Sequence, residues 1–241
     1  MGINVHDDNR VEFDDTHQDR VDTSLARNMS SKHVQGVPYH FIFRRKRSRA
    51  SDAADGNPLI YALKEMKGFR MDAACRTLVM DRAQQVVLKD RAKLAADAII
   101  SIPSSYSFCN EFSEMLGAWL GIPVIAGDFI GKKTVSQVLA EAQAGNPQFP
   151  NSYVHGLYKD QIKKWQALPA NTQVALKHVD TKIRPYFNHL ALNPPLPNLQ
   201  ERSVLVVDDI MASGTSLRCT IELLQGQGVR VASGVCFLSG L

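Results

Sequence analysis

The residues of this chain that could do chemistry gather at positions 204–216, VLVVDDIMASGTS. Four branched aliphatic residues lead into two adjacent carboxylates, Asp208 and Asp209. A run of small residues follows them and consists of Ala212, Ser213, Gly214, Thr215 and Ser216. Small residues let the backbone approach an anion closely, and the first N–H groups of a following helix attract phosphate. The two carboxylates beside such a loop suit a sugar phosphate with free hydroxyls.

The stretch must be positioned by a strand, a loop and a helix. An apolar run over 203–208 without alternation predicts a strand that is covered on both faces, as in a parallel sheet. A helix over 216–225 and a strand over 229–238 complete the unit, with Gly226 and Gly228 ending the helix. In open α/β sheets ligands bind at the carboxyl ends of the strands, which is where Asp208 and Asp209 fall.

The rest of the chain repeats the alternation of helices and strands. Helices are predicted over 57–68, 70–90 and 110–120, and strands over 97–103 and 122–127. This order predicts an α/β fold, a Rossmann-like parallel sheet flanked by helices. Residues 131–200 are less regular and are interpreted as a helical insertion or hood, with helices in TVSQVLAEAQ and over 172–190.

The loop from Pro103 to Ser107 leaves the first strand of this core at the same sheet edge. The hydroxyls and N–H groups of Ser104 and Ser105 are candidates for holding a second anionic group, and a polar turn without a ligand is the alternative interpretation. The loop has no lysine or arginine, so the nearest sequence candidates for positive charge are Lys132 and Lys133. His178 and His189 are weaker candidates for general bases, because no carboxylate is paired with them at a fixed spacing.

VLVVDDIMASGTS closely resembles the phosphoribosyl-pyrophosphate (PRPP) signature of type I phosphoribosyltransferases. The resemblance implies that Asp208 and Asp209 hold the ribose hydroxyls, directly or through Mg²⁺. It also implies that residues 212–216 hold the 5′-phosphate. Purine-salvage members that act on hypoxanthine or guanine have an acid where this chain has Ala212, which argues against that substrate class.

Other segments resemble the competence protein F (ComF) branch, in the order of that family. These segments are LIYALKEMKG, ISIPSS, SFCNEFSEMLGAWLGIP and KKTVSQVLAEAQAGN. The chain departs from the family in lacking the cysteine-rich zinc module at its start. The segment from Asn151 to Pro195 is also longer than the family needs.

Residues 1–35 carry seven acidic and four basic side chains and few large apolar ones, which predicts a polar tail or partner-binding arm outside the core. Residues 36–241 are then one phosphoribosyltransferase-like domain. A basic cluster follows the arm, and it suits either nucleic-acid phosphates or a solvated edge strand. Its members are Arg44, Arg45, Lys46, Arg47 and Arg49.

The chain has 241 residues, a formal net charge of +4 and four dispersed cysteines without metal-ligand spacing. No apolar run is long enough to span a bilayer, which predicts a cytoplasmic protein without membrane contact. We also expect a homo-oligomer or a subunit of a larger complex.

Three functions remain open. The first is Mg²⁺-dependent transfer of a phosphoribosyl group from PRPP to an unidentified acceptor. The second is a regulator or effector subunit that binds PRPP or a nucleotide without turnover. The third is a component of a nucleoprotein complex, in bacterial DNA uptake or phage defence, and it is compatible with the second.

Overall fold

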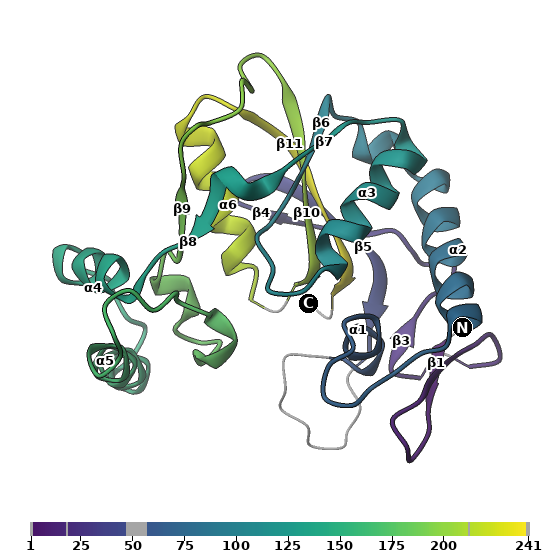
Figure 1. The fold of residues 1–241 in the computed structure, drawn as a ribbon, viewed down its shortest axis with the longest axis horizontal. Helices are drawn as coiled ribbons and strands as arrows, with labels where there is room; N and C mark the ends of the chain where they lie inside the picture. The colour runs from purple at the N-terminus through teal and green to yellow at the C-terminus, as the bar shows by residue number, and fades with distance from the viewer. Residues whose placement is uncertain (1, 18, 47–56, 212, 240–241) are drawn as a thin grey trace.

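The computed structural model describes residues 2–17, 19–46, 57–211 and 213–239. Its described part contains the predicted α/β fold, built on a twisted central sheet (Figure 1). Strands β5, β11, β10, β6 and β7 run parallel in that order, while β3 and β4 pair antiparallel with β5. The strands are β3 (Val21–Asp22), β4 (Ser30–Val34), β5 (Val37–Arg45), β6 (Ala98–Ser101), β7 (Val124–Ile125), β10 (Ser203–Met211) and β11 (Arg230–Ser239).

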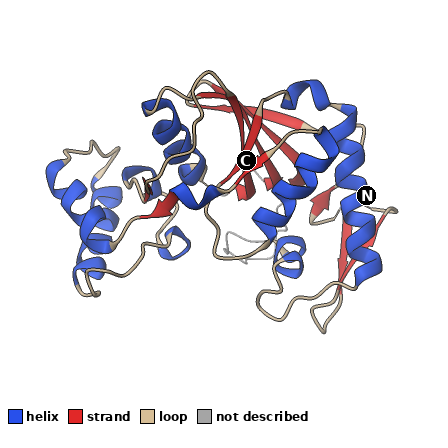
Figure 2. Ribbon diagram, turned by 45° about the horizontal axis from the view of Figure 1, so that its top comes forward, coloured by secondary structure: helices blue, strands red, loops and turns tan. Residues whose placement is uncertain are grey.

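The sheet is covered on both faces, as the unbroken apolar run of β10 predicts. Alternate residues of β10 enter different cores: Leu205 and Val207 belong to one cluster, and Val204 and Val206 to the other. The first cluster packs under α1 (Pro58–Leu63), α2 (Ala73–Lys89) and α3 (Phe108–Leu120), and the second under α6 (Thr215–Gly226). Helices therefore lie on both sides of the strands (Figure 2).

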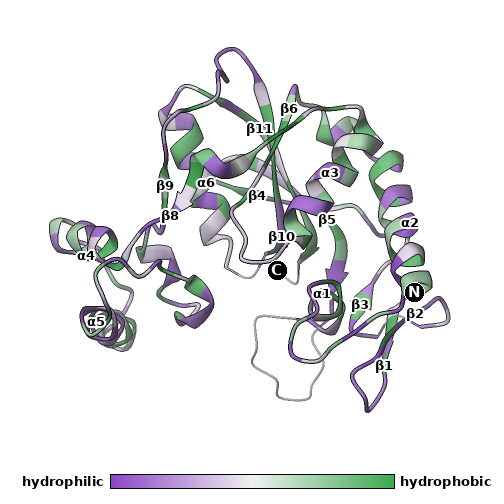
Figure 3. Cartoon of the chain, in the orientation of Figure 1, coloured by the Kyte–Doolittle hydropathy of each residue, from purple (hydrophilic) through white to green (hydrophobic). Residues whose placement is uncertain are grey.

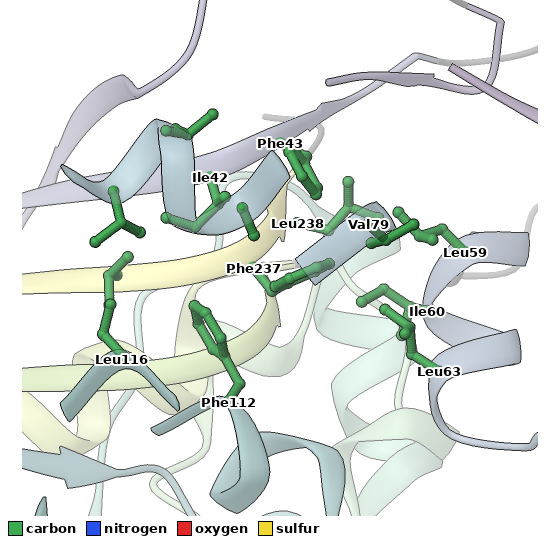
Figure 4. Close-up of a cluster of buried hydrophobic side chains, with 14 of the residues drawn as sticks. Ile42, Phe43, Leu59, Ile60, Leu63, Val79, Phe112, Leu116, Phe237 and Leu238 are labelled. Atoms are coloured by element: carbon green, nitrogen blue, oxygen red, sulfur yellow. The ribbon is translucent and has the colours of Figure 1, made fainter. Parts of the chain in front are cut away.

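The core under α1 to α3 is rich in aromatic side chains. Phe237 of β11 makes edge-to-face contacts with Phe43, Phe108 and Phe112, with ring centroids 5.1–5.2 Å apart. Figure 4 shows Phe237 between the strands and the apolar side chains of α1. Hydrophobic residues run along the central strands, whereas α2 and α3 mix hydrophobic and hydrophilic residues (Figure 3). Most residues of β5, β6, β10 and β11 are thus buried, whereas the outer strand β4 exposes Ser31, Lys32 and His33.

The helix boundaries follow local capping. Asn57 and Asp72 accept hydrogen bonds from N–H groups in the first turns of α1 and α2, which is the usual role of an N-cap. Gly121 ends α3 in the left-handed conformation with a φ of 71°, which glycine adopts without strain. These boundaries lie close to the predicted ones, although α1 ends several residues before 68. The short 3₁₀ turns Arg91–Leu94 and Gly127–Phe129 were not predicted.

The N-terminal segment belongs to the core, so the expectation of a polar arm over residues 1–35 is wrong in this respect. Strands β1 (Gly2–Val5) and β2 (Val11–Asp14) form a hairpin, and Ile3, Val11 and Val21 are buried in the core under α2. The N–H of Val11 donates to the carbonyl of Arg70 at 2.8 Å. The apolar residues are few, but Cys75 of α2 contacts β2 at Val11 and Phe13, and Val21 lies on β3 of the central sheet.

The predicted insertion forms a lobe with its own apolar core, seen beside the sheet in Figure 1. It leaves the domain through β8 (Ile130–Lys132) and returns through β9 (Leu190–Leu192), which pair antiparallel. Between them lie α4 (Val135–Ala144), as predicted, and α5 (Ser152–Gln166), which was not predicted.

The helix predicted over 172–190 is wrong. That segment contains only the 3₁₀ turns Leu176–His178 and Arg184–Tyr186. Pro185 has no N–H for a helical hydrogen bond, and the carboxylate of Asp180 binds the N–H of Lys182, which favours a turn. The segment packs its apolar residues, among them Val174, Ile183 and Phe187, against α5. Among the described residues, no helix combines the length and apolar character that a bilayer crossing requires.

The burial of the N-terminal hairpin predicts the effect of Ile3→Ala, because Ile3 is 1% exposed. Removing a buried isoleucine side chain should lower the free energy of unfolding by about 2–4 kcal/mol. Leu78→Ala is the matched control, since Leu78 is 53% exposed on α2, and it should change stability by roughly 0.5 kcal/mol or less. Both values come from urea unfolding. Equal effects of the two substitutions would show that the hairpin does not contribute to the core.

Candidate functional site

Asp208 and Asp209 lie where β10 extends beyond the end of its neighbour β6. Strand β6 pairs with β10 only as far as Val207 opposite Ser101, whereas β11 pairs with β10 to Met211. Beyond Val207 one edge of β10 is therefore left open, and the loop that follows β6 turns across it. Asp208 and Asp209 belong to the strand itself and line the cavity at this opening, so their backbone is fixed by pairing with β11.

The cavity has a volume of about 220 Å³ and brings together four parts of the chain. The first part is the end of β10, and the second is the start of α6. The third is the loop after β6, together with Lys64 at the end of α1, and the fourth is the insertion. Four cationic side chains and two carboxylates line it, and this excess of positive charge suits an anionic ligand. The polar lining residues are Lys64, Ser104, Ser105, Tyr106, Lys132, Lys177, Arg184, His189, Asp208, Asp209, Ser213, Thr215 and Ser216.

The second carboxylate is held by an ion pair that the sequence did not indicate. Lys64 Nζ lies 2.6 Å from Asp209 Oδ2, and both side chains are less than 10% exposed. The hydroxyl of Ser104 donates to the same oxygen at 3.2 Å. Lys64 also lies 5.4 Å from the centre of the Tyr106 ring, a cation–π distance. Asp209 is thus compensated within the protein.

The first carboxylate has a different environment. Asp208 Oδ1 accepts the N–H of Asp209 at 2.8 Å. Burial, and next the negative charge of Asp209, raise the pKa of Asp208 to about 7, although Lys64 and two backbone N–H groups oppose the shift. Asp208 is therefore poised between its neutral and charged forms near neutral pH.

The phosphate-loop candidate lies between β10 and α6. Gly214 has a φ of 72° and is the N-cap of α6, so it offers no side chain to cap the helix. The first turn of α6 contains no acidic residue either. Ser213 and Thr215 exchange a hydrogen bond of 3.0 Å between their hydroxyls. The first N–H groups of α6 thus suit an external anion. Ala212 lies outside the described residues.

The insertion supplies the opposite wall. His189, 4% exposed, places Nε2 at 3.3 Å from the hydroxyl of Ser216, and its Nδ1 has no hydrogen-bond partner among the described residues. Burial, and then the charges of Lys132, Lys133, Arg218 and Arg184, lower the pKa of His189 to about 4. His189 is therefore neutral at pH 7. It is suited to donate or accept a hydrogen bond at the ligand, while the neighbouring cations supply charge.

Of the other residues that the sequence suggested for the site, Lys132 lines the cavity, whereas Lys133 and His178 do not. Lys132 Nζ donates to the hydroxyl of Ser105 at 2.8 Å and lines the cavity. Lys133 is buried and paired with Glu141 at 2.6 Å, so it serves the lobe rather than the cavity. His178 is not among the residues that line the cavity. Sequence reasoning missed Lys64, Arg184 and Lys177, and only Lys64 lies in a segment singled out by its resemblance to a family.

Part of the basic cluster lies at the same sheet edge as the acids. Arg44 and Arg45 end β5, which runs parallel to β11 and β10, and Lys46 follows. Arg44 donates to the carbonyl oxygen of Arg27 at 3.1 Å. Arg47 and Arg49 lie outside the described residues, and binding of nucleic acid by this cluster stays a prediction.

One known protein family is similar in sequence to the C-terminal part of this chain. Residues 158–240 match the sequence family described as the phosphoribosyl transferase domain. The match includes β9, β10, α6 and β11, and hence both acids and the phosphate-loop candidate. The similarity to this family therefore covers about a third of the chain, including the candidate site.

Two solved structures are similar to this chain over nearly its whole length. Adenine phosphoribosyltransferase from Leishmania tarentolae is similar at 11% identity and a TM-score of 0.38, over 99% of this chain and 94% of the other. The enzyme from Leishmania donovani gives 14% identity and a TM-score of 0.38, over 99% and 86%. No curated protein matches the sequence. The similarity in sequence to a known family therefore rests on residues 158–240.

The raised pKa of Asp208 predicts how Asp208→Asn changes stability with pH. A carboxyl whose pKa is higher in the folded state stabilises the fold fully below its unfolded pKa of 3.8, and this contribution is lost as pH rises through 7. Asparagine cannot ionise, so the variant should gain roughly 2–4 kcal/mol on the wild type between pH 4 and pH 8, at about 1.4 kcal/mol per pKa unit.

The measurement is urea unfolding across that pH range. Asp160→Asn, on an exposed residue of α5, is the control and should run parallel to the wild type. A parallel profile for Asp208→Asn as well would mean that Asp208 is not a strained acid.

Proposed function

We propose that this protein binds PRPP and transfers its phosphoribosyl group to an acceptor with release of pyrophosphate. The observation that carries the proposal is a single cavity that joins an acidic pair to an uncapped helix N-terminus at the carboxyl edge of the sheet. PRPP has the matching groups: two ribose hydroxyls, a 5′-phosphate and a diphosphate.

Each part of PRPP has a counterpart in the cavity. Asp208 and Asp209 accept hydrogen bonds from the ribose hydroxyls. The N–H groups from Ser213 to Ser216 hold the 5′-phosphate, with help from the hydroxyls. Ser104, Ser105 and Lys132 lie on the remaining side and hold the diphosphate.

In the transfer step, a lone pair of the acceptor forms a bond to C1 of the ribose. The bond from C1 to the diphosphate oxygen breaks, and its electron pair leaves with the diphosphate. The protein contributes position and charge: it holds both ends of PRPP still and neutralises the departing group. Neutral His189, next to Ser216, orients the ligand by hydrogen bonding and does not add charge.

Mg²⁺ fits this site as a cation that arrives with the diphosphate. The carboxylates of Asp208 and Asp209 are the oxygen ligands that Mg²⁺ prefers. One ligand atom from each of these residues and from Cys109 lie within 4.8 Å of one another. The thiol of Cys109 is a poor ligand for a hard ion, because burial raises its pKa well above the usual value. When bound, Mg²⁺ would neutralise the leaving diphosphate.

The finer relation to the ComF branch is part of the proposal. It is supported by the segment LIYALKEMKG, which forms α1 and brings Lys64 into the cavity.

A second candidate function is binding without turnover, as in a regulator or effector subunit of a DNA-uptake or phage-defence complex. The loop from Pro103 to Ser107 favours it, since this loop carries no charge of its own and Ser104 is engaged with Asp209. Calorimetry with PRPP and Mg²⁺, followed by assay of pyrophosphate release with a panel of bases and amines, separates the two functions. Binding with release supports the transferase, and binding without release supports the regulator.

Asp208→Asn combined with Asp209→Asn should abolish PRPP binding, with at least a hundredfold loss of affinity by calorimetry. Two charged acceptors of the ribose hydroxyls are removed, and a hydrogen bond to a charged group contributes about 1.5–3 kcal/mol. Asp160→Asn is the control and should bind as the wild type does. Unchanged affinity in a folded double variant would refute the assignment of the ribose site.

Gly214→Val should weaken PRPP binding by at least about 2 kcal/mol, the scale of several charge-assisted hydrogen bonds lost together. A Cβ at Gly214 would lie 2.8 Å from the terminal methyl of Met211, and valine strains a left-handed backbone.

Gly228→Val is the matched control for that strain, because Gly228 has a φ of 75° and open space around it. Both variants should lose thermal stability, and only Gly214→Val should lose affinity. If both bound PRPP equally well, the loop would be an ordinary turn.

A further inference from the structure

Lys64 is the least expected member of the cavity. It directly follows α1, whose start is fixed by the side chain of Asn57 on the N–H of Leu59. Leu59, Ile60 and Leu63 anchor this short helix in the core under α2 (Figure 4). With the helix held in this way, Lys64 is brought to the strand end, and its side chain is only 9% exposed.

A lysine in such a place needs a partner of opposite charge, because an unpaired ammonium that is removed from water destabilises the fold strongly. Asp209 provides it at 2.6 Å. Oδ2 of Asp209 also accepts from the hydroxyl of Ser104 at 3.2 Å. The same oxygen therefore receives two donors.

A divalent cation placed on the acid pair would have to compete with both donors. Its positive charge would also lie next to the Lys64 ammonium, and two like charges in a partly dehydrated cavity repel each other strongly. The acid pair looks like a metal site in sequence, but the structure already fills it with a cation.

We propose that Lys64 is a built-in counter-ion that holds Asp209 in place of a metal, so that the acid pair binds no divalent cation until a ligand brings one. Lys64 is a positioning residue: its ion pair holds the side chain of Asp209 in one orientation before a ligand binds. An ammonium has three N–H donors, so Lys64 can keep Asp209 and also donate to an anionic group of the ligand. The inference rests on the proposed function only in identifying that ligand as PRPP.

The test measures binding of Mn²⁺ alone to the whole chain of 241 residues. Electron paramagnetic resonance detects the Mn²⁺ that stays free in solution. Mn²⁺ prefers the same oxygen ligands as Mg²⁺ and is directly observable. The wild type should bind Mn²⁺ only weakly. Lys64→Met, which removes the ammonium and keeps much of the apolar stem, should bind it at least tenfold more tightly. Adding Asp209→Asn to Lys64→Met should remove the gain.

Two controls make the result specific to the charge at this position. Lys67→Met changes a lysine three residues away, which is exposed and donates to the hydroxyl of Tyr61, and it should bind Mn²⁺ as the wild type does. Lys64→Arg keeps the charge and should also stay weak. Lys64→Gln provides a polar, uncharged variant if methionine prevents folding, which thermal melting would reveal.

The proposal is overturned if the wild type binds Mn²⁺ as tightly as folded Lys64→Met or Lys64→Gln, or if neither variant gains affinity. These outcomes do not depend on PRPP. Calorimetry with PRPP on the wild type tests the proposed function separately: absence of PRPP binding together with a gain of Mn²⁺ affinity would refute that function and leave the role of Lys64 intact.

Discussion

Two adjacent carboxylates at the end of a buried strand are the physical constraint around which this structure is organised. Asp208 and Asp209 are fixed by the pairing of β10 with β11, and Asp209 is buried while Asp208 is partly buried. Like charges this close repel each other, and burial together with the charge of Asp209 makes Asp208 harder to ionise. Two features reduce this repulsion. Asp209 has Lys64 and Ser104 as partners, and the raised pKa of Asp208 lets it be partly neutral near pH 7.

The insertion forms the part of the cavity wall that the central sheet does not provide. Its separate apolar core, with Tyr158, Trp165 and Phe187, gives it enough rigidity to present side chains at a defined place. From there it turns Lys132, Lys177, Arg184 and neutral His189 toward the acids and the start of α6. Positive charge therefore reaches the cavity mainly from a part of the chain that the central sheet does not contain.

The features of this site that favour ligand binding lower the stability of the free protein. A raised pKa for Asp208, a buried lysine and an uncapped helix start each cost stability in the free protein. An anionic ligand with hydroxyl groups relieves all three at once, because it accepts from the cations and the helix N–H groups and donates to the acids. This complementarity supports a ligand of the PRPP kind more directly than any one residue does.

The sequence by itself determined the parallel strands, their flanking helices and the position of the acids, because apolar periodicity and the loop chemistry at 208–216 are local properties. It did not determine the place of the N-terminal hairpin, whose few apolar residues are buried only because α2 covers them. Nor did it determine the irregular 172–190 segment or α5. Lys64 illustrates the difference best: 145 positions separate it from Asp209 along the chain, and only the tertiary fold decides that the two charges meet.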